Sequence, residues 1–272
     1  PAEEVPRLGV PEPHGVVALI TPWNDPVAVS LQNLAAAIVV GNAVLWKPSE
    51  RAPLTADLIA RCAADVLPAG VLSVLQGGGD TGEAVLRRDE VAMVLFVGGT
   101  ATGRQVARRC AERTIPTVLE LGGNDAMVVD GTVDVGWAAE QAALGCFANA
   151  GQICSGTERV LVDRSVHDEL CEALVAQAAA WRPGDPMDPA TRLGPLVDRR
   201  HRDAVHAVVT DAVEAGATLM TGGAVPDGPG SYYPPTVLGD VPRDCALMTS
   251  ETFGPVAAVC PVDGIDGALE LM

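Results

Sequence analysis

The stretch GQICSG places Cys154 between Gly151 and Gly156, in a segment whose glycines predict a flexible loop. A thiol on such a loop attacks a bound substrate once it is ionised, which is the chemistry of a covalent catalyst. No histidine neighbours it in the sequence, so a papain-like pair is not indicated. Most cysteines are small buried hydrophobes, and composition alone does not single out Cys154.

Three further segments carry residue types that bind nucleotides or move protons. In KPSE, Lys47 and Glu50 follow an apolar run, where a carboxylate can accept both hydroxyls of a ribose and would repel a 2′-phosphate. In FVGGTATG, Gly98 and Gly99 would let a phosphate approach the backbone at a helix start. In LELGGN, Glu120 lies between two leucines, an apolar setting that would keep it available as a general base. Taken singly, each has an ordinary alternative: a surface loop, a tight turn or a solvated carboxylate.

The elements that would position these residues alternate between strands and helices. Such alternation is typical of a parallel sheet with helices on both faces. Because ligands bind outside the carboxyl ends of parallel strands, we expect the polar and glycine positions to gather at one edge. The predicted strands are 16–20, 43–46, 72–75, 91–97 and 117–121. The positions expected at the edge are Asn24, Lys47, Glu50, Gly98, Gly99, Gly103 and Glu120.

Apolar spacing predicts the helices. Leu31, Leu34, Ala35, Ile38 and Val39 fall on one helix face in the first half of the chain. A second pattern starts after Gly122-Gly123, so we place a domain boundary near residue 122. The later predicted elements are strands at 126–129 and 159–162 and helices at 133–149, 166–180 and 202–215, with loops at 182–197 and 222–236.

Composition excludes several classes of protein. Apolar residues make up 48% of the 272 residues and charged residues 19%, which is typical of a globular chain. The net charge of −17 argues against nucleic acid and anionic membrane as partners. Seven cysteines without a C-x-x-C pair indicate neither a disulfide framework nor a metal site, so a reducing cytoplasm is expected. No apolar run is long enough to span a membrane, and the first residues do not resemble a signal peptide.

Six motifs together point to a family. ITPWNDP, LWKPSE, FVGGTATG, LELGGN, GQICSG and ETFGPV occur in the order and approximate spacing of the NAD(P)-dependent aldehyde dehydrogenase superfamily, which the chain resembles from about residue 10 onward. The resemblance implies a parallel-sheet, Rossmann-like cofactor domain over 1–122, followed by an α/β catalytic domain over 123–272. Relative to the family, both domains are expected to be partial, with the fold incomplete at both termini.

The resemblance also implies a mechanism and a cofactor. Cys154 matches the nucleophile, which forms a thiohemiacetal and then a thioester, while Asn24 holds the oxyanion and Glu120 activates the hydrolytic water. Lys47 and Glu50 match residues at the adenosine ribose, and Gly98 and Gly99 match the turn near the pyrophosphate. Glu251 and Phe253 match contacts to the nicotinamide end. The expected cofactor is NAD, with NADP as an alternative, and no metal is expected.

More than one function is compatible with these motifs, and each function implies its own binding partners. The first hypothesis is an NAD-dependent aldehyde dehydrogenase, with a small-molecule aldehyde as substrate. The second is a non-catalytic, dehydrogenase-like fragment or pseudoenzyme that at most binds nucleotide. A cysteine hydrolase would explain Cys154 but not KPSE, the glycine turn or ETFGPV. The family implies a homo-oligomer for full-length members, an expectation that does not extend to this chain.

Overall fold

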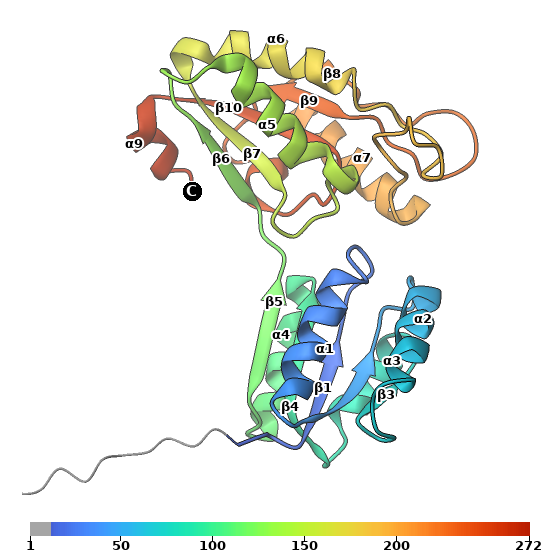
Figure 1. Ribbon diagram of the computed structural model, residues 1–272. Coiled ribbons are helices and arrows are strands. Elements are labelled where there is room, and N and C mark those ends of the chain that lie inside the picture. The colour runs from blue at the N-terminus through green and yellow to red at the C-terminus, as the bar shows by residue number, and fades with distance from the viewer. Residues whose placement is uncertain (1–11) are drawn as a thin grey trace, which may run out of the picture. The chain divides into compact units, whose positions relative to one another are not determined.

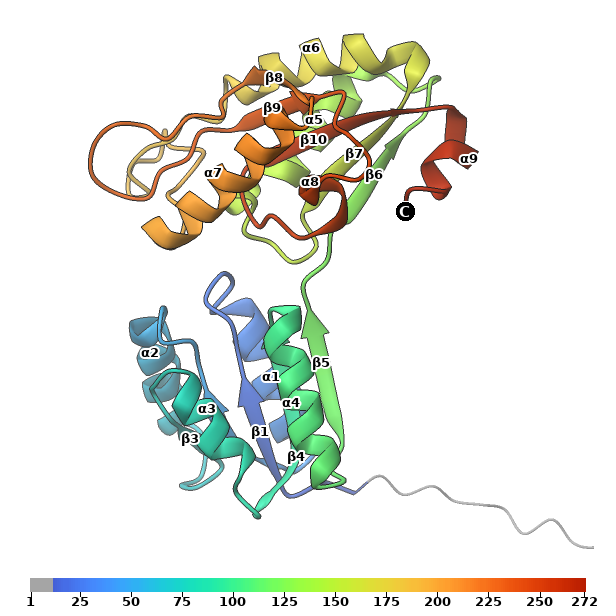
Figure 2. The same ribbon diagram turned by 180° about the vertical axis from the view of Figure 1, so that it is seen from behind.

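The computed structural model describes residues 12–272, which form two compact units, one ending at Leu121 and one beginning at Gly122. This division lies next to the boundary expected near residue 122. Within the described residues, each unit contains its own five-stranded sheet. Figures 1 and 2 show the elements of both units from opposite sides.

The first unit is a doubly wound α/β structure. Its elements are β1 (Val16–Ile20), α1 (Ala28–Val39), β2 (Ala43–Lys47), α2 (Pro53–Ala64), β3 (Leu72–Val74), α3 (Gly79–Leu86), β4 (Val91–Gly98), α4 (Thr100–Glu112) and β5 (Thr117–Leu121). The strands run parallel in the order β3-β2-β1-β4-β5. Helices α1 and α2 pack on one face of the sheet, and α3 and α4 pack on the other (Figures 1 and 2). The predicted parallel sheet with helices on both faces is therefore confirmed.

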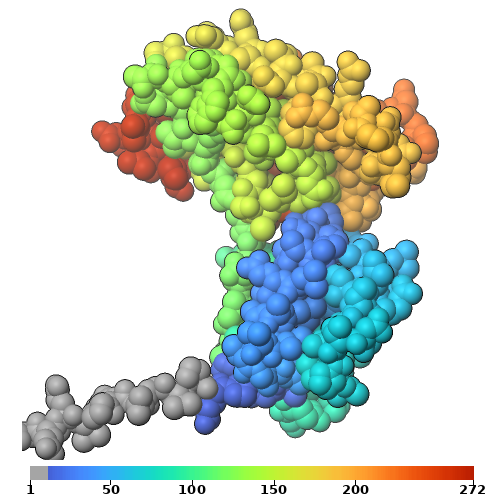
Figure 3. Space-filling view, viewed as in Figure 1, coloured from blue at the N-terminus to red at the C-terminus, as the bar shows by residue number. Residues whose placement is uncertain are grey.

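The apolar face of α1 is only partly buried. Leu34 lies in the core, whereas Leu31 and Val39 are 45% and 84% exposed. These side chains line an apolar groove that α1 shares with α2, on the face that Figure 3 shows. One row of α1 side chains therefore contacts the sheet, and the next row faces α2 across the groove.

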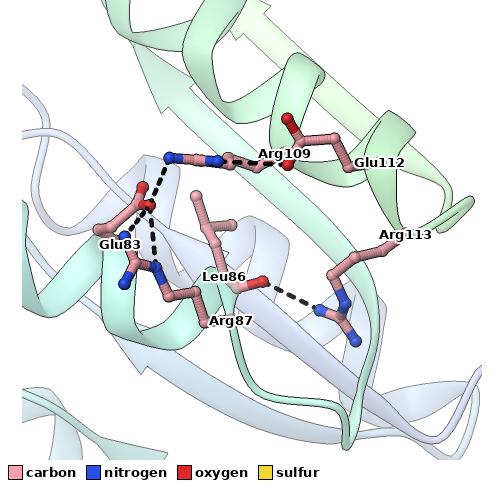
Figure 4. A network of polar contacts seen from close by, with 6 residues as sticks. All are labelled: Glu83, Leu86, Arg87, Arg109, Glu112 and Arg113. Carbon is pink, nitrogen blue, oxygen red and sulfur yellow. Dashed lines mark hydrogen bonds and ion pairs between the residues drawn. The ribbon is translucent and has the colours of Figure 1, made fainter.

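Polar contacts join α3 to α4 on the other face (Figure 4). Glu83 of α3 pairs with Arg109 of α4 at 3.1 Å. Arg113, which follows α4, donates to the carbonyl oxygens of Leu86 at 3.0 Å and Val91 at 3.1 Å. Exposed ion pairs contribute little to stability, whereas Arg113 satisfies carbonyls at the end of α3 and the start of β4.

The second unit is a mixed sheet with one continuous core. Its elements are β6 (Asp125–Val129), α5 (Val135–Phe147), η1 (Ala148–Gly151), β7 (Thr157–Asp163), η2 (Arg164–Val166), α6 (His167–Ala178), α7 (Arg199–Glu214), β8 (Thr218–Thr221), β9 (Thr236–Gly239), α8 (Ala246–Thr249), β10 (Val256–Val262) and α9 (Gly264–Leu269). The strand order is β6-β7-β10-β9-β8, and only β8 pairs antiparallel among these strands. Helices α5 and α6 lie on one face, and α7 and α8 lie on the other (Figures 1 and 2). Over residues 12–272, no helix is long and apolar enough to cross a membrane.

The central strand of this second sheet, β10, was not predicted. It begins directly after Gly254-Pro255, and Pro261 lies inside it. Prolines usually argue against a central strand because they donate no ladder hydrogen bond. The buried residues Val256 to Cys260 supply the apolar run that nevertheless places the strand at the middle of the sheet.

Candidate active site

The carboxyl ends of the first unit's strands lie level with one another. Ile20 of β1 pairs with Lys47 of β2 on one side and with Phe96 of β4 on the other. Val97 of β4 pairs with Glu120 of β5. The positions expected at this edge therefore end or follow adjacent parallel strands, which is where ligands bind in such sheets.

Asn24 lies in the bend between β1 and α1, which buried polar groups hold in place. Trp46 Nε1 donates to Thr21 Oγ1 at 2.9 Å, and Ser30 Oγ donates to the same oxygen at 3.1 Å. Trp46 and Ser30 are fully buried, so removing Thr21 Oγ1 would leave donors unsatisfied at about 1–3 kcal/mol each. These hydrogen bonds fix the bend that carries Asn24.

Lys47 and Glu50 form an ion pair, with Nζ 3.2 Å from Oε2. The lysine side chain is 7% exposed, whereas that of Glu50 is 55% exposed. The pKa of Glu50 lies below its ordinary value, chiefly because the backbone N–H of Glu50 donates to the carboxylate, and Lys47 lowers it further. The carboxylate is ionised and open to solvent, so it can accept hydrogen bonds from ribose hydroxyls.

Gly98 ends β4 and Gly99 is the N-cap of α4, so this helix begins inside the segment predicted as a glycine turn. Within the described residues, no side chain caps α4, which leaves its first backbone N–H groups directed at any bound anion. A Cβ on Gly98 would lie 2.8 Å from the Phe96 ring, whereas a Cβ on Gly99 would meet nothing within 4 Å. Together with the Lys47–Glu50 pair, this open helix start fits the phosphates and ribose of a dinucleotide.

The surroundings of Glu120 differ from the prediction. Side chains alternate along β5, so Leu119 and Leu121 pack against the first unit's core while Glu120 points to the opposite face and is exposed. The apolar setting inferred from the two flanking leucines was therefore wrong. The role of Glu120 as a general base stays a prediction.

The second unit carries Cys154 in a tight turn before β7. The N–H of Gly156 donates to the carbonyl of Ile153 at 2.9 Å, so Cys154 and Ser155 are the central residues of the turn. The Cys154 side chain is exposed. A Cβ on Gly156 would lie only 3.0 Å from the Ile153 carbonyl oxygen. The loop expected from the sequence is thus a defined turn whose geometry favours a glycine after the thiol.

The glycine before the thiol is required for a different reason. Asn149, Ala150 and Gly151 all have positive φ, of 51°, 57° and 70°. A Cβ on Gly151 would overlap the carbonyl group of Gly254 and lie 2.8 Å from Pro255 N. The backbone that leads into the Cys154 turn therefore packs directly against the ETFGPV segment.

The remaining cysteines differ in exposure. Cys110, Cys146, Cys171 and Cys260 are buried and Cys245 is half-buried, whereas Cys62 is exposed, as Cys154 is. His167 Nε2 lies 3.7 Å from the sulfur of Cys171. Burial raises the pKa of Cys171 to about 12, so this thiol is not ionised at neutral pH. Exposure is therefore common to Cys154 and Cys62, and Cys154 in addition lies in a constrained turn.

Glu251 lies against the paired glycines of LELGGN. Its carboxylate occupies the space where a Cβ on Gly122 would be, and it accepts a hydrogen bond from the backbone N–H of Gly123. The pKa of Glu251 is raised, first by burial and then by the negative charge of Glu158. The glycine pair thus makes room for the carboxylate that, by the family resemblance, is expected at the nicotinamide end of the cofactor.

Three polar residues around Phe253 were not identified from the sequence. Glu158 and His201 hold the backbone of Phe253, and Asn124 donates to Glu158 at 2.9 Å. The available signal was the glutamate of TERVLVD, which lies just before the apolar run VLV of the same strand, and a carboxylate buried there needs hydrogen-bond donors. Over residues 12–272, no group of three or more His, Cys, Asp and Glu side chains is arranged to hold a metal ion.

Comparisons with known proteins agree with the fold. The model of the aldehyde dehydrogenase family matches residues 5–272. The chain is 43% identical to 3,6-anhydro-alpha-L-galactose dehydrogenase from Streptomyces coelicolor, over 94% of this chain and 54% of that protein. It is 38% identical to succinate-semialdehyde dehydrogenase from Paenarthrobacter nicotinovorans, over 96% of this chain and 58% of that protein.

Solved structures give the same result. The crystal structure of a Mycobacterium tuberculosis aldehyde dehydrogenase complexed with NAD+ superimposes with a TM-score of 0.93 at 38% identity, covering 96% of this chain and 55% of that one. A 3,6-anhydro-L-galactose dehydrogenase structure superimposes with a TM-score of 0.92 at 34% identity, covering 96% of this chain and 56% of that one. The chain spans about half the length of the relatives that it matches.

Proposed function

Because the chain belongs to the aldehyde dehydrogenase family, we propose that the protein oxidises an aldehyde to the carboxylic acid and reduces NAD. The observation that carries the proposal is the turn of Cys154, an exposed thiol that flanking glycines hold in a defined geometry. The ionised Lys47–Glu50 pair beside an uncapped helix start supports dinucleotide binding.

In the proposed reaction the Cys154 thiolate attacks the aldehyde carbonyl carbon and forms a thiohemiacetal. The Asn24 amide and the Cys154 backbone N–H donate hydrogen bonds to the oxyanion, where negative charge develops in the transition state. NAD, when bound, supplies the acceptor for the hydride that leaves the former carbonyl carbon. Glu120 then takes a proton from water, which attacks the thioester and releases the acid and the thiolate.

The cofactor residues divide between the two units. In the first unit, Lys47 and Glu50 would hold the adenosine ribose, and the Gly98-Gly99 turn would face the pyrophosphate. In the second unit, Glu251 and Phe253 would contact the nicotinamide end. The charge of Glu50 disfavours a 2′-phosphate and so favours NAD, with NADP as the alternative, since relatives of this chain include enzymes named for NAD and for NADP.

The test is NADH formation at 340 nm from NAD and a panel of aldehydes. Cys154→Ala should abolish turnover, by roughly 10⁴-fold or more, because the nucleophile is lost. Cys62→Ala is the matched control, since it removes the other exposed thiol, and it should retain wild-type activity. Turnover that survives in Cys154→Ala would refute the assignment of the nucleophile.

A second candidate is a non-catalytic form that binds nucleotide only. The observation that favours it is the nucleotide-binding geometry of the first unit, the Lys47–Glu50 pair and the uncapped start of α4, which needs no catalytic thiol. Folded protein that binds NAD but forms no NADH with any aldehyde would select this candidate. In-frame, family-like coding sequence on both sides of this stretch would instead show that the chain is part of a full enzyme.

The cellular compartment of the protein, its ligands and its oligomeric state are also proposals. Seven cysteines without a disulfide among them support a reducing cytoplasm. The net charge of −17 disfavours nucleic acid as a partner, which leaves the small-molecule aldehyde and the cofactor as ligands. Assembly into a homo-oligomer is the family expectation for a full-length protein.

A further inference from the structure

Phe253 adopts a backbone conformation that its side chain disfavours. Its φ is +53°, in the left-handed region, which bulky residues rarely occupy. Such a conformation persists only when surrounding contacts hold it. The contacts around this residue therefore determine how the ETFGPV segment presents its side chains.

Glu158 of β7 holds the N-terminal side of this residue. Its carboxylate accepts from the N–H of Thr252, at 3.0 and 2.9 Å to its two oxygens, and from the N–H of Phe253 at 2.8 Å. Glu158 is only 7% exposed, so little water competes for these hydrogen bonds. Asn124 donates to the same carboxylate at 2.9 Å and orients it.

His201 of α7 holds the C-terminal side. Its Nε2 lies 2.7 Å from the carbonyl oxygen of Phe253. A carbonyl oxygen only accepts, so Nε2 carries the hydrogen in this bond. The imidazole also meets the phenyl ring edge-on, with centroids 6.2 Å apart and planes inclined at 64°. Asp198, the N-cap of α7, accepts from the backbone N–H of His201 at 2.7 Å and fixes the helix turn that carries it.

We propose that Glu158 and His201 are positioning residues that clamp the Phe253 backbone from its two sides and thereby orient Phe253 and Glu251 toward the nicotinamide end of the cofactor. The inference rests on the proposed function and extends it, because neither residue needs to touch the cofactor. Loss of the hydrogen bonds to either Glu158 or His201 lets φ of Phe253 relax toward negative values. That rotation displaces the phenyl ring and the neighbouring Glu251, while the adenosine half of the site in the first unit keeps its residues.

The two halves of the cofactor give a test by comparison. ADP carries the adenosine ribose and two phosphates but lacks the nicotinamide ribose and ring, whereas NADH carries both halves. We expect His201→Leu in the full chain to raise the Kd for NADH about tenfold, the effect of about one hydrogen bond, with the Kd for ADP unchanged. His201→Gln should restore NADH binding, because a glutamine amide can donate to the same carbonyl. Glu158→Gln should show the same loss selective for NADH, because one amide oxygen cannot serve all the donors that the carboxylate serves.

His206→Gln is the matched control, since His206 lies on the same helix but contacts Tyr233. It should leave both dissociation constants at the wild-type values. Equal NADH affinity in wild type and His201→Leu would overturn the clamp, and so would parallel losses of NADH and ADP affinity, which indicate a general structural role. Wild-type protein that binds neither nucleotide would overturn the proposed function and the clamp with it.

Amide hydrogen exchange gives an independent readout of the clamp. His201→Leu should speed exchange in peptides that contain Thr252 and Phe253. Unchanged exchange would contradict the clamp, whatever the result of the nucleotide-binding experiments.

Discussion

The contact between Gly151 and Gly254 can be tested by adding one methyl group. Gly151→Ala places a Cβ where the structure has the carbonyl group of Gly254, with Pro255 N at 2.8 Å. The obstacle is backbone on both sides, so no side-chain rotation can relieve it. The variant must therefore separate the residues before Cys154 from the ETFGPV segment or distort one of them.

Two terms set the size of the effect. Alanine at φ +70° costs about 1–2 kcal/mol relative to a residue in the right-handed region. Overlap in a packed interior typically costs a further 1–3 kcal/mol or so. The sum of roughly 2–5 kcal/mol corresponds to a fall in melting temperature of about 4–20 °C for a unit of this size.

The assay pairs thermal unfolding with thiol labelling. Gly194→Ala is the control, because Gly194 does not have positive φ and a Cβ there meets nothing within 4 Å. It should change stability by less than about 0.5 kcal/mol. In Gly151→Ala, the rate at which iodoacetamide labels Cys154 relative to Cys62 should also change, since the turn loses its support. A melting temperature and a labelling ratio equal to those of Gly194→Ala would refute the contact.

Two further predictions concern pH and helix packing. Burial raises the pKa of Glu158 in the folded state, so the stability that this group contributes is complete below its unfolded pKa and is lost as pH rises through its folded pKa. Denaturant unfolding from about pH 4 to about pH 8 should therefore show Glu158→Gln gaining stability relative to wild type as pH rises, and a constant difference would contradict the raised pKa. Arg113→Leu should lower the free energy of unfolding by about 1–2 kcal/mol, because the carbonyls of Leu86 and Val91 lose their donor. Exposed Arg108→Leu is the control, and equal losses in urea titrations would refute that account.

The sheet of the first unit could be predicted because the patterns that indicate it lie within short stretches of sequence. The buried strands are continuous apolar runs, and alternating helices imply parallel order. Once that order is known, Lys47 and Glu120 must lie at the same edge. What local sequence did not reveal was the direction of Glu120, because two leucine neighbours indicate an apolar environment only if all three side chains share a face.

The second unit was harder to predict because its important contacts are distant in sequence. The hydrogen bonds that Glu158 accepts from the N–H groups of Thr252 and Phe253 span 94 and 95 positions. No periodicity connects such residues, and the glutamate in TERVLVD gives only the information that a buried carboxylate needs donors. The resemblance predicts roles for Cys154, Glu251 and Phe253, whereas the residues that hold these three in place are recognisable only from the three-dimensional structure.

The glycines around Cys154 constrain the backbone, whereas the sequence had suggested that they make it flexible. Gly151 and Gly156 allow close packing: one abuts the backbone of Gly254, and the other closes a turn on Ile153. A catalytic thiol gains from such constraint, because a nucleophile already held in place loses less entropy on reaching its transition state. Since Gly254 directly follows the clamped Phe253, any displacement of that residue is transmitted to the thiol turn through backbone contacts within the second unit. Loss of the clamp should therefore alter both the nicotinamide contacts and the reactivity of Cys154, although neither Glu158 nor His201 belongs to the thiol turn.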